Sequence, residues 1–317
     1  MTEVALLALE GNNPLGFLAA LGTLDALTIS VPQATLRWTD DLVPYAVVGG
    51  VGGFDELLDV LELDREAWAG GTVLGFPADS PLPDAKPEAE ELRAWFEAVA
   101  VVPERREADL LCSLVAEGAF DGAGKNAKPT HFHFTAGRQQ FLDMVRTLAS
   151  EVSREQLGEA VHGPWSYASK LPSLSWDAGS ERIYAVRATN PSDDKRLGVP
   201  GADWLAFRGL IFFPVRTLWQ SLRTTACDDD WKRSAFRWPL WRVPASRDVV
   251  WSLVADPTLV SLRADRRTPA VLHERGIGVV LQAPIKRNDQ GGYGAFGAPE
   301  ILVSAAASSI RVDPEEL

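Results

Sequence analysis

With 317 residues, of which 46% are hydrophobic and 23% charged, the chain is long enough to bury a sizeable core in one large or two modest domains. The formal net charge of −12 excludes a protein that coats nucleic acid through its overall electrostatic field. Two cysteines are too few for a disulfide framework, and residues 1–8 lack the features of a secretion signal. No stretch of the sequence is long and apolar enough to span a membrane, so we expect a cytoplasmic protein.

The clearest local signal is a helix that begins at Pro14. Asn13 is a favoured N-cap, and proline suits the first helical position. Leucines recur near the helical period, while Gly16 and Gly22 are small enough to let another backbone come close. Because glycine inside a helix costs about 1 kcal/mol relative to alanine, we expect tight packing at both positions. The run is too short, and too interrupted by Asp25, to span a membrane.

The other predicted elements mix short strands with helices. In chain order we expect strands at residues 4–9, 35–39 and 44–48, a glycine turn and helix at 49–63, a helix at 88–100, a strand at 130–134, a helix from a Thr135 cap to about Val152, a hairpin of strands 173–177 and 182–188, an apolar segment at 203–215, an aromatic stretch at 235–243, a helix at 246–255 and a strand at 277–285. This mixture predicts an α+β protein with two tightly joined lobes. We expect an acidic N-terminal lobe at residues 1–160, which contains the buried Pro14 helix, and a more basic C-terminal lobe at 161–317.

Charged side chains are unevenly distributed along the chain. Residues 1–180 have a large excess of Asp and Glu, whereas residues 181–290 carry more Lys and Arg than Asp and Glu. A local basic surface can contact phosphates even on an acidic protein, so we expect any nucleic-acid face in the second segment. The alternative is that the acidic and basic halves dock on each other, or that both are solvated.

The strongest binding signal is the stretch at residues 223–242, which interleaves cations with aromatic rings. This mixture suits phosphate neutralisation combined with stacking on bases. Lysine and arginine also precede a glycine-rich loop at residues 283–299. The predicted nucleic-acid-binding residues are Arg223, Lys232, Arg233, Arg237, Trp238, Arg242, Lys286 and Arg287. The alternative interpretation is that the aromatic rings belong to the core and the cations to its solvated rim.

The sequence contains no recognisable catalytic motif. If residues 130–134 form a strand, His131 and His133 share one face and could bind a metal together with the carboxylates of residues 228–230. This pattern leaves a metal-dependent hydrolase as an alternative. A polar strand face is the simpler interpretation, because the chain has only four histidines. We therefore expect no metal, no cofactor and no enzymatic activity.

Four segments resemble proteins encoded with type I-G CRISPR-Cas systems, formerly type I-U. They are GNNPLGFLAALGTL at residues 11–24, SKLPSLSWDAGSERIYAVRATNPS at 169–192, GADWLAFRGLIFFP at 201–214 and RWPLW at 237–241. The first is similar to the start of the large-subunit-like and accessory proteins of that subtype, and the second and third to their central part.

The resemblance covers the chain discontinuously, and its motifs are structural. It implies a non-catalytic subunit or accessory of an RNA-guided interference complex in antiviral defence, which contacts target DNA or guide RNA. The resemblance also implies backbone and RNA-processing subunits and a helicase-nuclease as partners. The chain has neither helicase motifs nor an HD nuclease motif, so another protein must cut the DNA. In such assemblies base pairing reads the target, while protein holds the strands by their backbone. An interaction protein without nucleic-acid contact is a further possibility.

Overall fold

The computed structural model describes residues 2–135, 137–179, 197–262, 270–287 and 293–304, and these residues form an α+β protein, as the sequence predicts. One antiparallel sheet contains the strands β1 (Glu3–Glu10), β3 (Tyr45–Gly49), β2 (Thr35–Trp38) and β9 (Ala245–Ser246) in that order. In a second sheet, the long strand β10 (Ile277–Arg287) pairs antiparallel with β8 (Ala235–Trp241), β12 (Glu300–Ser304) and β11 (Gly294–Phe296).

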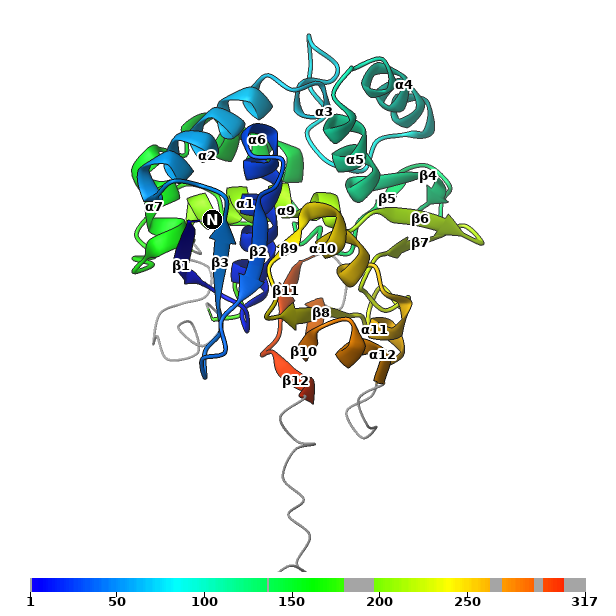
Figure 1. Cartoon of the computed structure of the whole chain (residues 1–317). Coiled ribbons are helices and arrows are strands. Elements are labelled where there is room, and N and C mark those ends of the chain that lie inside the picture. Colours follow the sequence, from blue (N-terminus) through cyan, green and yellow to red (C-terminus); the bar gives the residue numbers. More distant parts are fainter. Residues whose placement is uncertain (1, 136, 180–196, 263–269, 288–292, 305–317) are drawn as a thin grey trace, which may run out of the picture.

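Two small hairpins complete the strands of the described residues. The first consists of β4 (Val115–Phe120) and β5 (Ala127–Pro129), and the second of β6 (Val215–Leu218) and β7 (Ser221–Thr224). β4 packs against β6, so the two hairpins lie side by side at one edge of the molecule (Figure 1).

The centre of the fold is a crossing of helices α1 (Pro14–Ser30) and α9 (Pro200–Gly209). The Asn13 side chain caps α1 as predicted, by accepting a hydrogen bond from the Leu15 N–H. A Cβ atom added to Gly22 would lie 1.8 Å from the Leu205 carbonyl oxygen of α9. A Cβ atom added to Gly16 would lie 2.6 Å from a backbone oxygen at the end of β1. The predicted close packing at both glycines is therefore confirmed.

The remaining helices cover this pair and the sheets (Figure 1). They are α2 (Phe54–Ala69), α3 (Thr72–Gly75), α4 (Ala89–Ala100), α5 (Arg105–Leu114), α6 (Phe141–Glu151), α7 (Arg154–His162), the short 3-10 helix η1 (Leu210–Phe212), α10 (Arg247–Val254), α11 (Pro257–Ser261) and α12 (Ala270–Glu274). Helices α2, α6 and α7 pack around α1 and α9. Within the described ranges, no helix combines the length and apolar character that crossing a membrane requires.

One hydrophobic cluster extends from Leu6 in β1 to Val303 in β12. Segments from both halves of the chain contribute to it, since α9 packs on α1 and β9 pairs with β2. The division into lobes at residue 160 stays a prediction, and any such lobes share a single core.

Two predicted strands and the predicted start of one helix are wrong. Residues 131–134 form a turn and irregular backbone instead of a strand, and the following helix begins at Phe141 instead of Thr135. The left-handed φ of 65° at Gly137 is incompatible with a helix that continues from Thr135. Residues 173–177 form no strand either, because Ser175 also has a left-handed φ of 65°. The expected partner strand at 182–188 lies outside the described residues.

Candidate nucleic-acid interface

A cavity of about 660 Å³ lies next to β8 and β10 and brings together five of the eight predicted binding residues. These are Lys232, Arg233, Arg237, Lys286 and Arg287, and we call the cavity that they line the basic groove. Residues 232–237 and 286–287 thus supply one positively charged surface, although about 50 residues separate them in the sequence.

Strand pairing explains why these segments meet. β8 and β10 run antiparallel with Arg237 opposite Gln282. The pairing continues beyond the start of β8, because the Ile285 N–H donates a hydrogen bond of 2.8 Å to the Ser234 carbonyl. The end of β10 therefore lies beside the loop at residues 228–234, which precedes β8.

Three cations of the basic groove are exposed: Lys232, Arg233 and Lys286. The Asp230 carboxylate accepts hydrogen bonds from the backbone N–H groups of Lys232 at 2.9 Å and of Arg233 at 3.3 Å. This turn fixes the backbone from which both side chains extend. Cations held in this way can contact phosphate oxygens without reading base sequence.

Arg237 and Arg223 are bound by carboxylates of the same loop. Arg237 is almost completely buried, and its guanidinium donates to both oxygens of Asp228, at 2.6 and 3.2 Å. Such bidentate pairs are among the strongest hydrogen-bonded ion pairs. Arg223, in β7, forms an ion pair with Asp229. Arg237 therefore forms the floor of the basic groove, and Arg223 holds the loop against β7.

Arg287 is also held in place by the fold. Its guanidinium carbon lies 3.7 Å from the centre of the Trp231 ring, and it donates to the backbone carbonyls of His131 at 2.8 Å and His133 at 3.0 Å. Burial lowers its pKa to about 10, so it stays protonated at neutral pH. Arg287 contributes positive charge to the groove from a fixed position.

Trp238 and Arg242 lie outside the basic groove. Trp238 is fully buried, stacks on Phe236 and donates its indole N–H to the Gly11 carbonyl at 2.8 Å. The prediction that Trp238 stacks on bases is therefore wrong, because its ring is covered by the core and has no face exposed to solvent. Arg242 follows the opposite end of β8, where it pairs with Asp40.

The residues of the alternative metal site do not converge. The Nδ1 atom of His131 lies 2.8 Å from the Thr224 hydroxyl, whereas Nε2 of His133 lies 2.6 Å from the Asp84 carboxylate. Burial lowers the pKa of both histidines, that of His131 to about 3. In the part of the chain that the structure describes, no three His, Cys, Asp or Glu side chains are grouped so that they could hold a metal ion.

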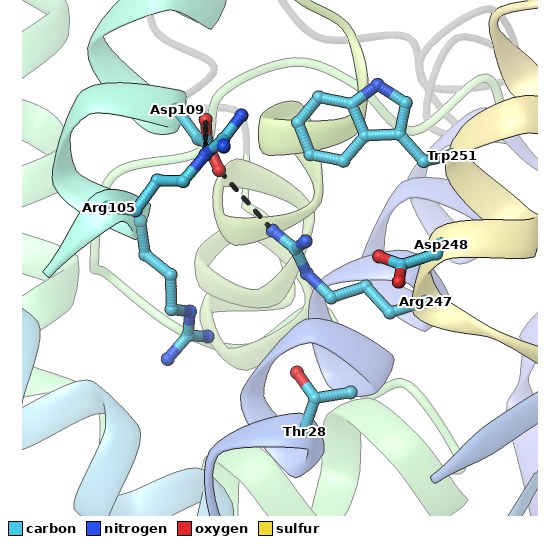
Figure 2. A pocket seen from close by; sticks show the side chains of 7 residues that line it. Thr28, Arg105, Asp109, Arg247, Asp248 and Trp251 are labelled. Atoms are coloured by element: carbon cyan, nitrogen blue, oxygen red, sulfur yellow. Dashed lines mark hydrogen bonds and ion pairs between the residues drawn. The ribbon is translucent and has the colours of Figure 1, made fainter. Parts of the chain in front are cut away.

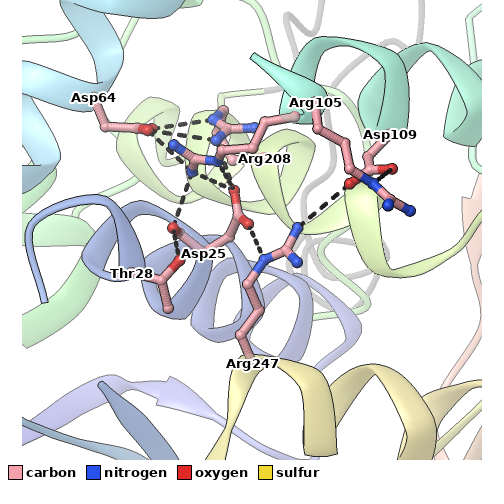
Figure 3. Close-up of polar contacts among 8 residues, drawn as sticks. Asp25, Thr28, Asp64, Arg105, Asp109, Arg208 and Arg247 are labelled. Atoms are coloured by element: carbon pink, nitrogen blue, oxygen red, sulfur yellow. Dashed lines mark hydrogen bonds and ion pairs between the residues drawn. The ribbon is translucent and has the colours of Figure 1, made fainter. Parts of the chain in front are cut away.

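A second polar cluster, the arginine-aspartate network, lies at the α1–α9 crossing (Figure 3). It consists of Asp25, Asp64, Arg106, Arg208 and Arg247. The fully buried Arg208 binds Asp25 at 2.8 Å and Asp64 at 3.0 Å, and Arg247 binds Asp25 at 2.7 Å. Burial alone would raise the pKa of Asp25, but the charges of Arg208, Arg106 and Arg247 outweigh it and lower the pKa. The network thus stabilises the contact between helices from distant parts of the chain.

A cavity of about 490 Å³ opens at the edge of this network (Figure 2). Its lining includes Arg105, Arg106 and Arg247, which at first suggests an anion site. However, Asp109 extends between Arg105, at 3.4 Å, and Arg247, at 3.8 Å, and Arg106 and Arg247 both bind Asp25. Since carboxylates of the chain already neutralise these cations, the cavity favours a structural role.

Comparison of the chain with protein-family models finds no match, and comparison with curated proteins finds none either. The geometry and charge of the basic groove are therefore the features of the described residues that bear on function.

Proposed function

We propose that the chain is a non-catalytic, cytoplasmic subunit or accessory of a type I RNA-guided interference complex, and that the basic groove contacts the phosphate backbone of target DNA or guide RNA. The proposed partners are the backbone and RNA-processing subunits and a helicase-nuclease. This role requires no cofactor of its own. The observation that carries the proposal is the meeting of Lys232, Arg233 and Lys286 in one groove on a chain with a net charge of −12.

The charge distribution supports a local and sequence-independent contact. The acidic remainder of the protein repels nucleic acid, so binding requires a site where cations outnumber carboxylates. In the basic groove, the carboxylate of Asp228 is neutralised by its ion pair with Arg237. Arg287 adds a further positive charge. Lys232, Arg233 and Lys286 are exposed and can neutralise phosphates of a strand that lies along the groove.

The salt dependence of binding tests this proposal. Lys232→Ala, Arg233→Ala and Lys286→Ala should each weaken binding of single-stranded DNA or RNA of any sequence, and each should reduce the slope of log affinity against log salt by about 0.7. Arg93→Ala is the matched control, because Arg93 is an exposed cation on α4, remote from β8 and β10 (Figure 1). It should leave both quantities unchanged.

Two results would contradict the proposal. Groove variants that bind with the affinity and slope of the native chain would mean that the cations are only a solvated rim. The chain could also co-purify with partner subunits without contacting nucleic acid. That result would favour the alternative function, an interaction protein without nucleic-acid contact. Normal co-purification with guide RNA, lost in the combined groove variant, is the supporting outcome.

A further inference from the structure

The turn between β6 and β7 carries an exposed tryptophan, Trp219, which none of the sequence patterns above indicates. Trp219 is 90% exposed, whereas the next most exposed Phe, Trp or Tyr in the described ranges, Tyr293, is 43% exposed. Leu218 pairs with Ser221, so Trp219 and Gln220 form a two-residue turn at the tip of the hairpin. The ring therefore extends from the end of the β6–β7 hairpin into solvent.

The stability of the hairpin does not explain this tryptophan. Trp219 and Gln220 have φ values of 50° and 63°, which define a turn that asparagine and glycine favour strongly. A bulky side chain is unfavourable in this conformation, and exposure of a large apolar ring to water is unfavourable as well. Trp219 therefore has an unfavourable backbone conformation and an unfavourable exposure to water, and it does not pack on the hydrophobic core. This combination points to a binding role.

The fold holds the tip in a defined position. Val215 and Leu222, on the inner face of the hairpin, pack on Ala119 of β4. The Lys128 ammonium group donates a hydrogen bond of 3.1 Å to the Gln220 carbonyl and so ties the turn to β5. The anchored hairpin lies beside β4 and β5 (Figure 1), and Trp219 is in the turn at its tip.

Positive charge links the hairpin to the basic groove. Arg216 and Arg223 are direct cross-strand partners, and since Asp229 neutralises Arg223, the exposed Arg216 is the cation of this pair that can contact a bound anion. Arg223 pairs with Asp229, in the same loop as Lys232 and Arg233. This ion pair joins the hairpin, with its exposed Arg216, to the loop that carries two cations of the basic groove.

We infer that Trp219 stacks on an unpaired base of a single strand whose phosphates follow Arg216 toward the basic groove. This inference rests on the proposed contact of the groove with nucleic acid. The stacking surface favours a single strand, because each base in a duplex already has its faces covered by its neighbours. The exposed Arg216 on the same hairpin favours a polyanion over an apolar protein partner.

The test compares Trp219→Ala and Trp219→Phe with the native full-length chain, using a fluorescent oligothymidine single strand and a duplex of mixed sequence at several salt concentrations. Trp219→Ala should weaken single-strand binding roughly 5- to 150-fold with an unchanged salt slope, because stacking is lost and no cation is removed. Trp219→Phe should retain most of the affinity, and duplex binding should not change. Arg216→Ala should instead lower the single-strand salt slope by about 0.7.

The outcomes separate this inference from the proposed function. If Lys232→Ala and Lys286→Ala weaken binding while Trp219→Ala does not, the groove proposal stands and the stacking inference is overturned. If Trp219→Ala binds nucleic acid normally but loses a partner subunit on co-purification, the hairpin contacts protein and the inference is again overturned. If the native chain binds neither probe, both proposals are overturned. Because Trp219 is exposed, its variants should keep the native melting temperature.

Discussion

The crossing of α1 and α9 predicts opposite effects for two identical substitutions. In Gly22→Ala, the new Cβ atom would lie 1.8 Å from the Leu205 carbonyl oxygen, whereas in Gly158→Ala, within α7, the nearest atom would be a leucine methyl carbon at 3.7 Å. Only the second distance is an ordinary van der Waals contact. Both changes gain about 1 kcal/mol of helix propensity. The difference between their effects therefore isolates the close approach of two backbones.

The expected magnitudes follow from these distances. Gly22→Ala must separate α1 from α9, and overpacking of this kind costs about 1–3 kcal/mol or more, even though propensity improves. Gly158→Ala has no such clash and should be neutral or stabilising by up to about 1 kcal/mol. Urea unfolding followed by circular dichroism measures both values on the full chain. A Gly22→Ala variant as stable as Gly158→Ala would refute the close crossing of the two helices.

Three further changes test the core and the buried charges. Asp25→Asn should reduce the free energy of unfolding, measured by urea denaturation, by about 3–5 kcal/mol, because it removes a charge that three arginines share. A loss below about 1 kcal/mol would argue against the network. Burial lowers the pKa of His131 from 6.5 to about 3, so the unfolded chain binds a proton that the folded chain excludes and stability should fall as the pH decreases below about 6.5. In His131→Asn this decline, followed by thermal melting between pH 7 and 4, should be shallower, and an unchanged pH profile would contradict the assignment. Trp238→Ala should cost about 3–5 kcal/mol of stability, and a variant that weakens nucleic-acid binding at native stability would return Trp238 to the interface.

The structure confirms what local signals could specify. Asn13, Pro14 and the small residues of α1 predicted its capped start and its close packing, because each of these signals depends on neighbours within a few residues. The helix that crosses Gly22 was not predictable, since α9 lies about 180 residues further along the chain and no periodicity identifies a distant partner.

The candidate site was predictable in part for the same reason. Clustered cations indicated the segments that line the basic groove. The burial of Trp238 depends on packing from other elements, so the interleaving of cations with aromatic rings predicted a wrong role for it. The tip at Trp219 escaped notice because neither tryptophan nor glutamine is a typical residue of a two-residue hairpin turn. Arg237 could not be assigned to the floor of the groove without knowledge of its pairing with Asp228.

The most direct test of the nucleic-acid role is photo-crosslinking within the assembled complex. A photoreactive amino acid is placed at Lys286, in the basic groove, or at Arg93 on α4, and the complex is irradiated with labelled guide RNA and target DNA. We predict a covalent adduct to nucleic acid from position 286 and none from position 93. Equal labelling at both positions, or adducts from position 286 only to partner subunits, would contradict the assignment of the basic groove to a nucleic-acid backbone.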